Sequence, residues 1–365
     1  MKTKNLFFAS ITAMLCLTGC GDTTSAQDST DTTSLETSQE TSSEDNELVQ
    51  EKLSFNVICP QGAPGLALST YLSTDADKVE ITTPLSTKNA FFSEDYDAII
   101  FDATTANTLI DVKGAKFKLA SIITAGNAFV LSTGNDDNGI MAEGDAILSF
   151  GNDSSVWNRV LKNAFSIDNV SYLGSTALAA SAAITGTNEG EDVDYVVVAE
   201  PYVTKVLEEA PEVSVKYNLK TEWANYSKEE GLNDGKGFTD FPQAGLFISD
   251  ELDSSTDEST INNIKNFISI IEKNSLDLIN NNGENVMKQI DQDVENGLYT
   301  TDETFGIDKD ILEKVVDQNQ NPMGIANALA FNACAYDYET FMSGSGNLGY
   351  SSPSENFYSQ YFQAE

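Results

Sequence analysis

Three residues with carboxylate side chains lie between a predicted strand and the helix that follows it: Asp102, Asp153 and Glu200. A carboxylate in such a position can cap the helix or accept hydrogen bonds from a bound cation or amine. The 365 residues contain no histidine, which excludes Ser-His-Asp and Cys-His catalysis, histidine-ligated metals and histidine proton shuttles. The residue types therefore favour recognition of a small molecule over nucleophilic catalysis.

The carboxylates belong to a set of five junctions that are rich in Gly, small polar residues and helix-capping types. The junctions are Cys59–Pro64, Phe101–Thr105, Phe150–Ser155, Leu173–Thr176 and Ala199–Tyr202. Any one of them is also explained by helix capping alone. In open α/β sheets, however, ligands bind beyond the carboxyl ends of strands, so five such junctions predict a cleft between two sheets. We expect ligand contacts from Gly62, Ala63, Pro64, Asp102, Thr104, Thr105, Asn152, Asp153, Ser154, Ser155, Ser175, Thr176, Glu200 and Tyr202.

The elements that must position these junctions alternate between short apolar runs and helical patterns. Predicted strands are Ser54–Cys59, Asp97–Phe101, Lys118–Ile123, Ala128–Ser132, Ala146–Phe150, Asn169–Leu173, Tyr195–Ala199, Glu212–Tyr217 and Gly245–Ser249. Predicted helices are Gly65–Ser73, Ala106–Val112, Ser155–Phe165, Ala177–Thr185, Tyr202–Glu209, Ile261–Asn280, Glu284–Glu295, Asp308–Asp317 and Gly324–Phe341. This order predicts an α/β fold with mixed, mostly parallel sheets flanked by helices.

The composition and charge of the chain exclude further classes of function. The chain has 57 acidic and 20 basic residues and a formal net charge of −37. Nucleic-acid binding and a polybasic membrane patch are excluded, because both need clustered Lys and Arg. The hydrophobic content of 40% predicts a globular body. Asn233-Asp-Gly235 and Asp302-Glu303 could offer oxygen ligands to calcium, but the EF-hand spacing is missing, so no metal is expected. No cofactor is expected either.

The N-terminus carries a short basic stretch, an apolar segment and then Leu17-Thr-Gly-Cys20. This pattern resembles a bacterial lipoprotein signal peptide, in which Cys20 receives the lipid and becomes the mature N-terminus. Residues 1–19 are then the signal peptide, and residues 20–52 an acidic Ser/Thr-rich tether. The resemblance implies a protein held on the outer face of the cytoplasmic membrane by its lipid alone. The tether is typical of Gram-positive bacteria.

The junctions resemble those of the solute-binding proteins of ABC importers, in the branch for nitrate, sulfonates, bicarbonate and thiamine precursors. The motifs are Gln61–Gly65, Asp95–Asp102 with Thr104–Asn107, Phe150–Ser155, Ser175–Gly186, Asp194–Pro201 and Pro242–Ile248. The resemblance implies the two-lobed, type II periplasmic-binding fold, with hinges near Gly139–Asp145 and Gln243–Ser249. Lobe one then comprises residues 53–143 and 246–365, with the helical C-terminal part covering it, and lobe two comprises residues 144–245. It also implies that the protein delivers its ligand to permease and ATPase subunits and breaks no bond. We expect a monomer, because lobe closure needs free surfaces.

Two alternatives remain open: a surface sensor or adhesin domain, and a non-hydrolytic enzyme, each built on the same two-lobed fold. The ligand is predicted to be neutral or cationic, because the five junctions contain Asp102, Asp153 and Glu200 but no Lys or Arg. A nitrogen heterocycle stacked on Tyr202 or Trp157 would satisfy this prediction. Cys59 and Cys334 are expected to be buried free thiols, with a disulfide between them as the alternative.

Overall fold

The computed structural model describes residues 52–135, 139–280, 282–316 and 353–362. The described residues form one compact unit that contains both sheets. The lipoprotein motif, the tether up to residue 51, Cys334 and the predicted helix Gly324–Phe341 lie outside the described residues. Within those residues, no helix has the length and apolar character needed to cross a membrane.

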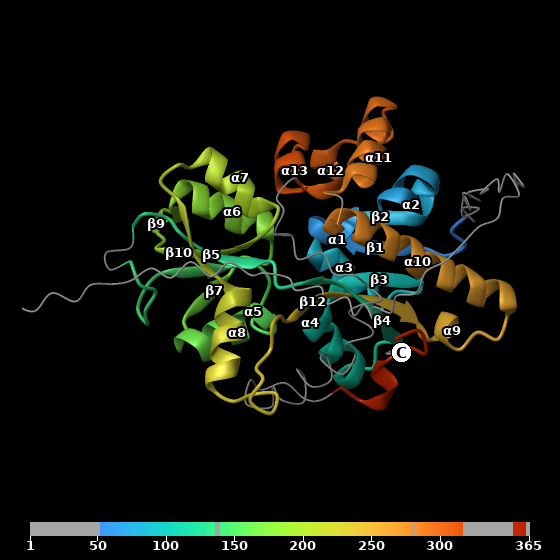
Figure 1. The fold of residues 1–365 in the computed structure, drawn as a ribbon, viewed down its shortest axis with the longest axis horizontal. Helices are drawn as coiled ribbons and strands as arrows, with labels where there is room; N and C mark the ends of the chain where they lie inside the picture. Colours follow the sequence, from blue (N-terminus) through green and yellow to red (C-terminus); the bar gives the residue numbers. More distant parts are fainter. Residues whose placement is uncertain (1–51, 136–138, 281, 317–352, 363–365) are drawn as a thin grey trace, which may run out of the picture. The chain divides into compact units, whose positions relative to one another are not determined.

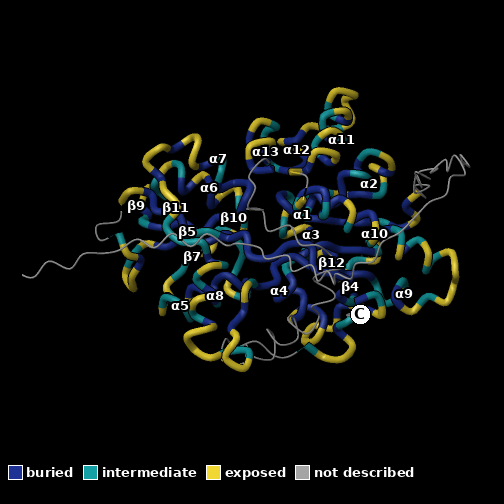
Figure 2. Tube along the Cα trace, in the orientation of Figure 1, coloured by how far each residue is buried: buried dark blue, intermediate teal, exposed yellow. Residues whose placement is uncertain are grey.

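The first sheet has five strands in the order β2-β1-β3-β12-β4. These strands span Val79–Thr82, Val57–Pro60, Ala98–Asp102, Pro242–Ser249 and Phe117–Ala125, in that order. The central strands are almost continuously buried, as expected for a sheet covered on both faces (Figure 2). Strand β1 pairs in parallel with β2 and β3, which brings the ends of β1 and β3 to one edge of the sheet.

The second sheet has five strands in the order β11-β5-β10-β6-β7. They span Ser214–Asn218, Ala128–Ser132, Tyr195–Ala199, Ile147–Ser149 and Val170–Tyr172. The chain segment before β10 forms a small two-stranded antiparallel ribbon of β8 (Thr187–Asn188) and β9 (Glu191–Asp192). The run Tyr195-Val-Val-Val-Ala199 makes β10 the buried centre of this sheet.

The helices fall into two groups that follow the two sheets (Figure 1). Those of the first lobe are α1 (Ala63–Leu66), α2 (Ser69–Thr74), the 3₁₀ turn η1 (Ala76–Lys78), α3 (Pro84–Ala90), α4 (Ala103–Asn107) and the π-helical turn η2 (Thr108–Val112). Those of the second lobe are α5 (Val156–Phe165), α6 (Thr176–Thr185), α7 (Tyr202–Glu209) and α8 (Leu219–Glu229).

The C-terminal part is helical, as predicted. It comprises α9 (Asp250–Asp253), α10 (Glu258–Asn280), α11 (Glu284–Glu295), α12 (Thr301–Phe305), α13 (Lys309–Val316) and the 3₁₀ turn η4 (Glu355–Phe357). Helices α10 and α11 pack against α2, and α12 packs against α1 and β2, so this part covers the first lobe. Helix α13 instead contacts α7 of the second lobe.

The two-lobed α/β architecture is confirmed, but parallel pairing does not predominate as predicted. Each sheet has two parallel and two antiparallel strand pairs. The reason is that β12 in the first sheet and β5 in the second are antiparallel to the neighbouring strand on each side, whereas β4 runs in the same direction as β3. Mixed sheets of this kind result when a chain leaves one sheet and later returns to it.

The first crossing between the sheets lies at Gly126–Asn127, not at Gly139–Asp145. Strand β4 ends at Ala125 in the first sheet and β5 begins at Ala128 in the second. Residues 128–135 therefore belong with the second sheet, although the sequence assigned them to lobe one. A Gly between two apolar runs resembles a hairpin turn, which is why the sequence did not reveal the crossing.

The return crossing ends at the start of β12, beside the first one. Gly126 N donates to Phe241 O at 3.1 Å, and Asn127 N donates to the side chain of Gln243 at 3.1 Å. Strand β12 then runs from Pro242 to Ser249 entirely within the first sheet. The predicted hinge at Gln243–Ser249 thus touches this crossing only at its first residue, and the two crossing strands are hydrogen-bonded to each other.

Candidate functional site

A cavity of about 400 Å³ lies between the two sheets, where the five junctions converge. Its volume is within the range of small-molecule binding sites. It is lined by Pro60, Gln61, Gly62, Ala63, Pro64, Pro84, Leu85, Lys88, Phe101, Asp102, Thr124, Asn127, Phe150, Gly151, Asn152, Ser155, Trp157, Leu173, Gly174, Thr176, Ala199, Glu200, Tyr202, Gln243 and Ala244. Both lobes and both crossings contribute, as in a site that closes around its ligand.

Nine of the fourteen residues expected at the ligand line this cavity. They are Gly62, Ala63, Pro64, Asp102, Asn152, Ser155, Thr176, Glu200 and Tyr202. The other five, Thr104, Thr105, Asp153, Ser154 and Ser175, are not among the lining residues. Thr105 is buried inside α4 and Asp153 is exposed, so position in a junction alone does not decide which side chain faces the cavity.

Two of these five residues, Thr104 and Ser154, link the two lobes. Thr104 Oγ1 lies 3.2 Å from Ser154 O, so a side chain of the first lobe donates a hydrogen bond to the backbone of the second. The same hydroxyl lies 3.0 Å from Asp102 Oδ1. Because this contact spans the cleft, the lobes here are in contact on the side of α4.

The two lining carboxylates both accept hydrogen bonds at the start of a helix: Asp102 is the N-cap of α4, and Glu200 directly precedes Pro201, the N-cap of α7. Asp102 Oδ1 accepts from Thr105 N at 2.6 Å at the start of α4. Glu200 accepts from Thr204 N and from Thr204 Oγ1, each at 3.0 Å, in the first turn of α7. Burial raises the pKa of both carboxyls, and the hydrogen bonds from the threonines oppose that rise. Both oxygens of Glu200 are therefore engaged, whereas Asp102 Oδ2 is buried without a hydrogen-bond partner among the described residues.

An aromatic wall occupies the side of the second lobe. Phe150 and Trp157 are stacked with their ring centroids 4.1 Å apart and an angle of 17° between the planes. Trp157 Nε1 donates to Ser149 Oγ at 3.1 Å and to Phe150 O at 3.3 Å, which fixes the indole. Tyr202, Phe101 and the aliphatic Leu173 add to the apolar lining. Such a wall suits a flat or apolar ligand body.

Lys88 lines the cavity from α3 but was not among the predicted site residues. Among the ion pairs of the described residues, none involves Lys88. Helix α3 was not predicted because it is short and has few apolar positions at helical spacing. Its start did carry a signal, since Thr83 caps the helix and Pro84 occupies its first position, a common helix opening.

The crossings also contribute lining residues that were not predicted. Asn127 and Gln243 are both buried, and the side chain of Gln243 accepts from Asn127 N. Their place in the site depends on where the chain changes sheets, which the sequence did not reveal.

Two further expectations concern cysteine and metal. Cys59 is a free thiol, fully buried, and burial raises its pKa. The expectation of a free thiol is confirmed at Cys59. Cys334 lies outside the described residues, and its state stays a prediction. In the part of the chain that the structure describes, His, Cys, Asp and Glu side chains form no group of three that could hold a metal ion.

The amino-acid sequence matches no protein-family model and no curated protein. Solved structures, in contrast, are similar over most of the chain. The ligand-binding component of an ABC-type import system from Staphylococcus aureus, solved with zinc bound, is 13% identical with a TM-score of 0.57, covering 85% of this chain and 98% of that one. The fold is that of periplasmic binding proteins.

Two other solved structures support the same assignment of fold. An ABC transporter protein from Parabacteroides distasonis is 13% identical with a TM-score of 0.55, over 85% of this chain and 99% of its own. The periplasmic aliphatic sulphonate binding protein from Escherichia coli is 14% identical with a TM-score of 0.50, over 83% of this chain and 89% of its own. At these identities the likeness extends to the fold and not to the ligand.

Proposed function

We propose that this protein is the solute-binding component of an ABC importer, which captures a small molecule in the interlobe cavity and delivers it to permease and ATPase subunits. The observation that carries the proposal is the cavity of about 400 Å³ lined by both lobes and both crossings. A site built this way is completed only when the lobes meet, so ligand binding and lobe closure are coupled. The structural neighbours named as an ABC transporter and as the ligand-binding component of an ABC-type import system support the same function.

The proposed location follows from the N-terminal motif. Cys20 would carry the lipid, and the acidic tether would hold the folded body outside the cytoplasmic membrane of a Gram-positive bacterium. The Cys20→Ala variant should then remain unprocessed or be shed from cells. If this variant stays with membranes and incorporates as much labelled lipid as the wild type, the lipid anchor is refuted.

The ligand was predicted to be neutral or cationic because no basic residue was expected at the cavity, and the structure places one there. The five junctions contain no basic residue, but Lys88 reaches the cavity from α3. Asp102 Oδ1 and both oxygens of Glu200 accept hydrogen bonds at the starts of α4 and α7, and Asp153 does not line the cavity. We therefore propose a ligand with a flat or apolar body against Phe150 and Trp157 and one acidic group near Lys88. The neighbour named as a sulphonate-binding protein is consistent with an organic acid.

Mass spectrometry of material that copurifies with the mature protein tests the binding function directly. A matched series of benzoate, benzenesulfonate, benzamide and benzylamine in thermal-shift assays tests the charge. We expect the acids to stabilise the protein most, and Lys88→Met to weaken their binding at least tenfold. The control is Lys113→Met, which changes an exposed lysine remote from the cavity lining. Selective stabilisation by benzylamine, unaffected by Lys88→Met, would contradict the proposed acidic ligand and favour a cationic one.

The two alternatives are separated by different measurements. A non-hydrolytic enzyme on this fold would convert the copurified compound during incubation, whereas a binding protein returns it unchanged. A sensor or adhesin domain would bind without supporting uptake in cells that carry the matching permease and ATPase. Unchanged compound together with uptake that depends on this chain is the outcome expected here.

A further inference from the structure

The turn between α12 and α13 lies against the binding loops of both lobes. Its first residue, Gly306, is the C-cap of α12 and has a φ of +79°. A methyl group built on Gly306 would overlap the Tyr202 hydroxyl oxygen, lie 3.2 Å from Tyr202 Cζ and lie 3.7 Å from Gln61 Cβ. Gln61 belongs to the first junction and Tyr202 to the last, and both line the cavity. The turn therefore fills the space between the two loops.

On the side of the first lobe, the turn is fixed through α12. Gln61 Nε2 donates to Glu303 O at 2.9 Å. Phe305, which is fully buried, packs edge-on against Tyr299 with the ring centroids 6.1 Å apart, and its ring reaches Gly65 of α1. Because α12 also packs against α1 and β2, this end moves with the first lobe.

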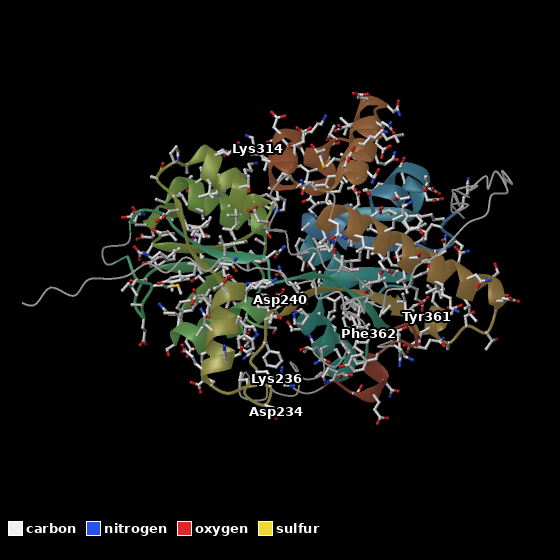
Figure 3. All side chains as sticks on the ribbon, viewed as in Figure 1. Asp234, Lys236, Asp240, Lys314, Tyr361 and Phe362 are labelled. Atoms are coloured by element: carbon white, nitrogen blue, oxygen red, sulfur yellow. The ribbon has the colours of Figure 1, made fainter. Side chains whose placement is uncertain are left out.

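On the side of the second lobe, contact is made by α13. Lys314 on α13 forms an ion pair with Glu208 on α7, and the two helices pack together (Figure 3). Tyr202 begins α7, lines the cavity and is 6% exposed. The same helix thus carries a wall of the cavity at one end and an attachment to the C-terminal part at the other.

We infer that the Gly306 turn, which lies behind the lining residues Gln61 and Tyr202, positions the Tyr202 ring and ties the second lobe to the first. The inference rests on the proposed function, since the site is the same cavity. Gly306 is a positioning residue: it acts on the ligand through Tyr202. Opening of the cleft must separate Tyr202 from Gly306 and Glu208 from Lys314. Only a residue without a side chain leaves room for the Tyr202 hydroxyl at this place.

The test compares Gly306→Ala with Gly297→Ala. Gly297 has a similar φ of +72°, but a methyl group there would meet nothing within 4 Å. Both variants carry the same backbone strain, so a difference between them reports the contact with Tyr202. We expect Gly306→Ala to raise hydrogen exchange severalfold in peptides covering 200–209 and 301–316 and to increase the radius of gyration. Gly297→Ala should leave both unchanged.

Two further variants keep the test decisive if Gly306→Ala folds poorly. Tyr202→Phe in the Gly306→Ala background removes the overlapping oxygen and should reverse most of the exchange increase. Glu208→Gln, an exposed change, should raise exchange in the same two peptides to a smaller extent. Equal exchange and scattering for Gly306→Ala and Gly297→Ala, or no reversal by Tyr202→Phe, would overturn the inference. These readouts need no ligand, so absence of any copurified solute would count against the proposed function alone.

Discussion

At the scale of single residues, the site combines buried carboxylates with helix caps. Glu200 illustrates the arrangement: it is 6% exposed, and both of its oxygens accept hydrogen bonds from Thr204. Burial raises its pKa above the ordinary 4.5, because the charged form loses hydration that two hydrogen bonds only partly replace. The capping interaction and the cost of burying the charge therefore oppose each other at one side chain.

This opposition predicts the pH dependence of stability. A raised pKa means that the folded state binds the Glu200 proton more tightly than the unfolded state does. The free energy of unfolding therefore falls as pH rises from about 4.5 through the folded-state pKa. Glu200→Gln should remove this part of the decline, as measured by urea unfolding at a series of pH values. Glu229→Gln, on the exposed end of α8, is the control. A decline of the same size in Glu200→Gln would contradict the prediction.

At the scale of elements, the crossings between the sheets depend on a glycine. Gly126 has a φ of +51°, and a methyl group there would overlap Asp240 Oδ1 and lie 3.0 Å from Lys220 Cβ. Asp240 and Lys220 form an ion pair beside the crossing (Figure 3). The backbone conformation and the lack of space both require glycine at this position.

Gly126→Ala should lower the free energy of unfolding by about 2 kcal/mol, because it adds both backbone strain and a clash. Gly114→Ala is the matched comparison, since Gly114 has a φ of +75° with nothing within 4 Å of the added methyl group. That control should lose only about 1 kcal/mol. Chemical denaturation of both variants measures the difference, and equal losses would show that the space beside Asp240 is not restricted.

A second element whose stability rests on one side chain is the segment 353–362. Asp253, which is 4% exposed, forms an ion pair with Lys118 at 2.8 Å and accepts from Ser359 Oγ at 2.6 Å and from Gln360 N at 3.0 Å. Asp253→Ala should cost about 3 kcal/mol, because it leaves the Lys118 ammonium unpaired and frees the segment. Limited proteolysis should then cut within 353–362, whereas the exposed Glu251→Ala on the same helix should leave the pattern unchanged.

The sequence predicted most elements and missed those without a strong periodic signal. Strands β5 and β10 and helices α7 and α11 have the predicted bounds, because each is a continuous apolar run or a regular amphipathic pattern. Strand β2 and helices α3, α8 and α12 were missed. Helix α3 mattered most for the site, since it carries Lys88.

Site prediction was limited by geometry that local patterns do not encode. The junctions were identified correctly because strand ends with capping residues are visible in the sequence. Which junction side chain faces the cavity depends on the helix turn that follows, as the contrast between lining Asp102 and buried Thr105 shows. Contacts made by distant segments, such as Gly306 with Tyr202, have no local signal at all.

At the scale of the whole molecule, the two lobes meet on more than one side of the cavity. Thr104 contacts Ser154 on the side of α4, and α13 contacts α7 on the side of the C-terminal helices. The remaining link is the pair of hydrogen-bonded crossings. Motion between the lobes is therefore expected about the crossings, with the other two contacts breaking on opening.

Small-angle scattering tests this motion. Protein stripped of ligand by partial unfolding and refolding should have a larger radius of gyration than protein holding its copurified solute. Thr104→Val removes the Thr104–Ser154 hydrogen bond and should shift the stripped form further toward opening. Identical scattering with and without solute would indicate a rigid molecule and would argue against delivery to a permease.

The placing of the two tryptophans gives the molecule an intrinsic optical signal. Trp157 lines the cavity and stacks on Phe150, whereas Trp223 is fully buried against Phe238, with ring centroids 5.8 Å apart, and does not line the cavity. A solute that enters the cavity changes the surroundings of one indole and leaves the other as a constant background. Trp223→Phe would therefore leave a single emitter, whose fluorescence follows occupancy of the cleft without any attached dye.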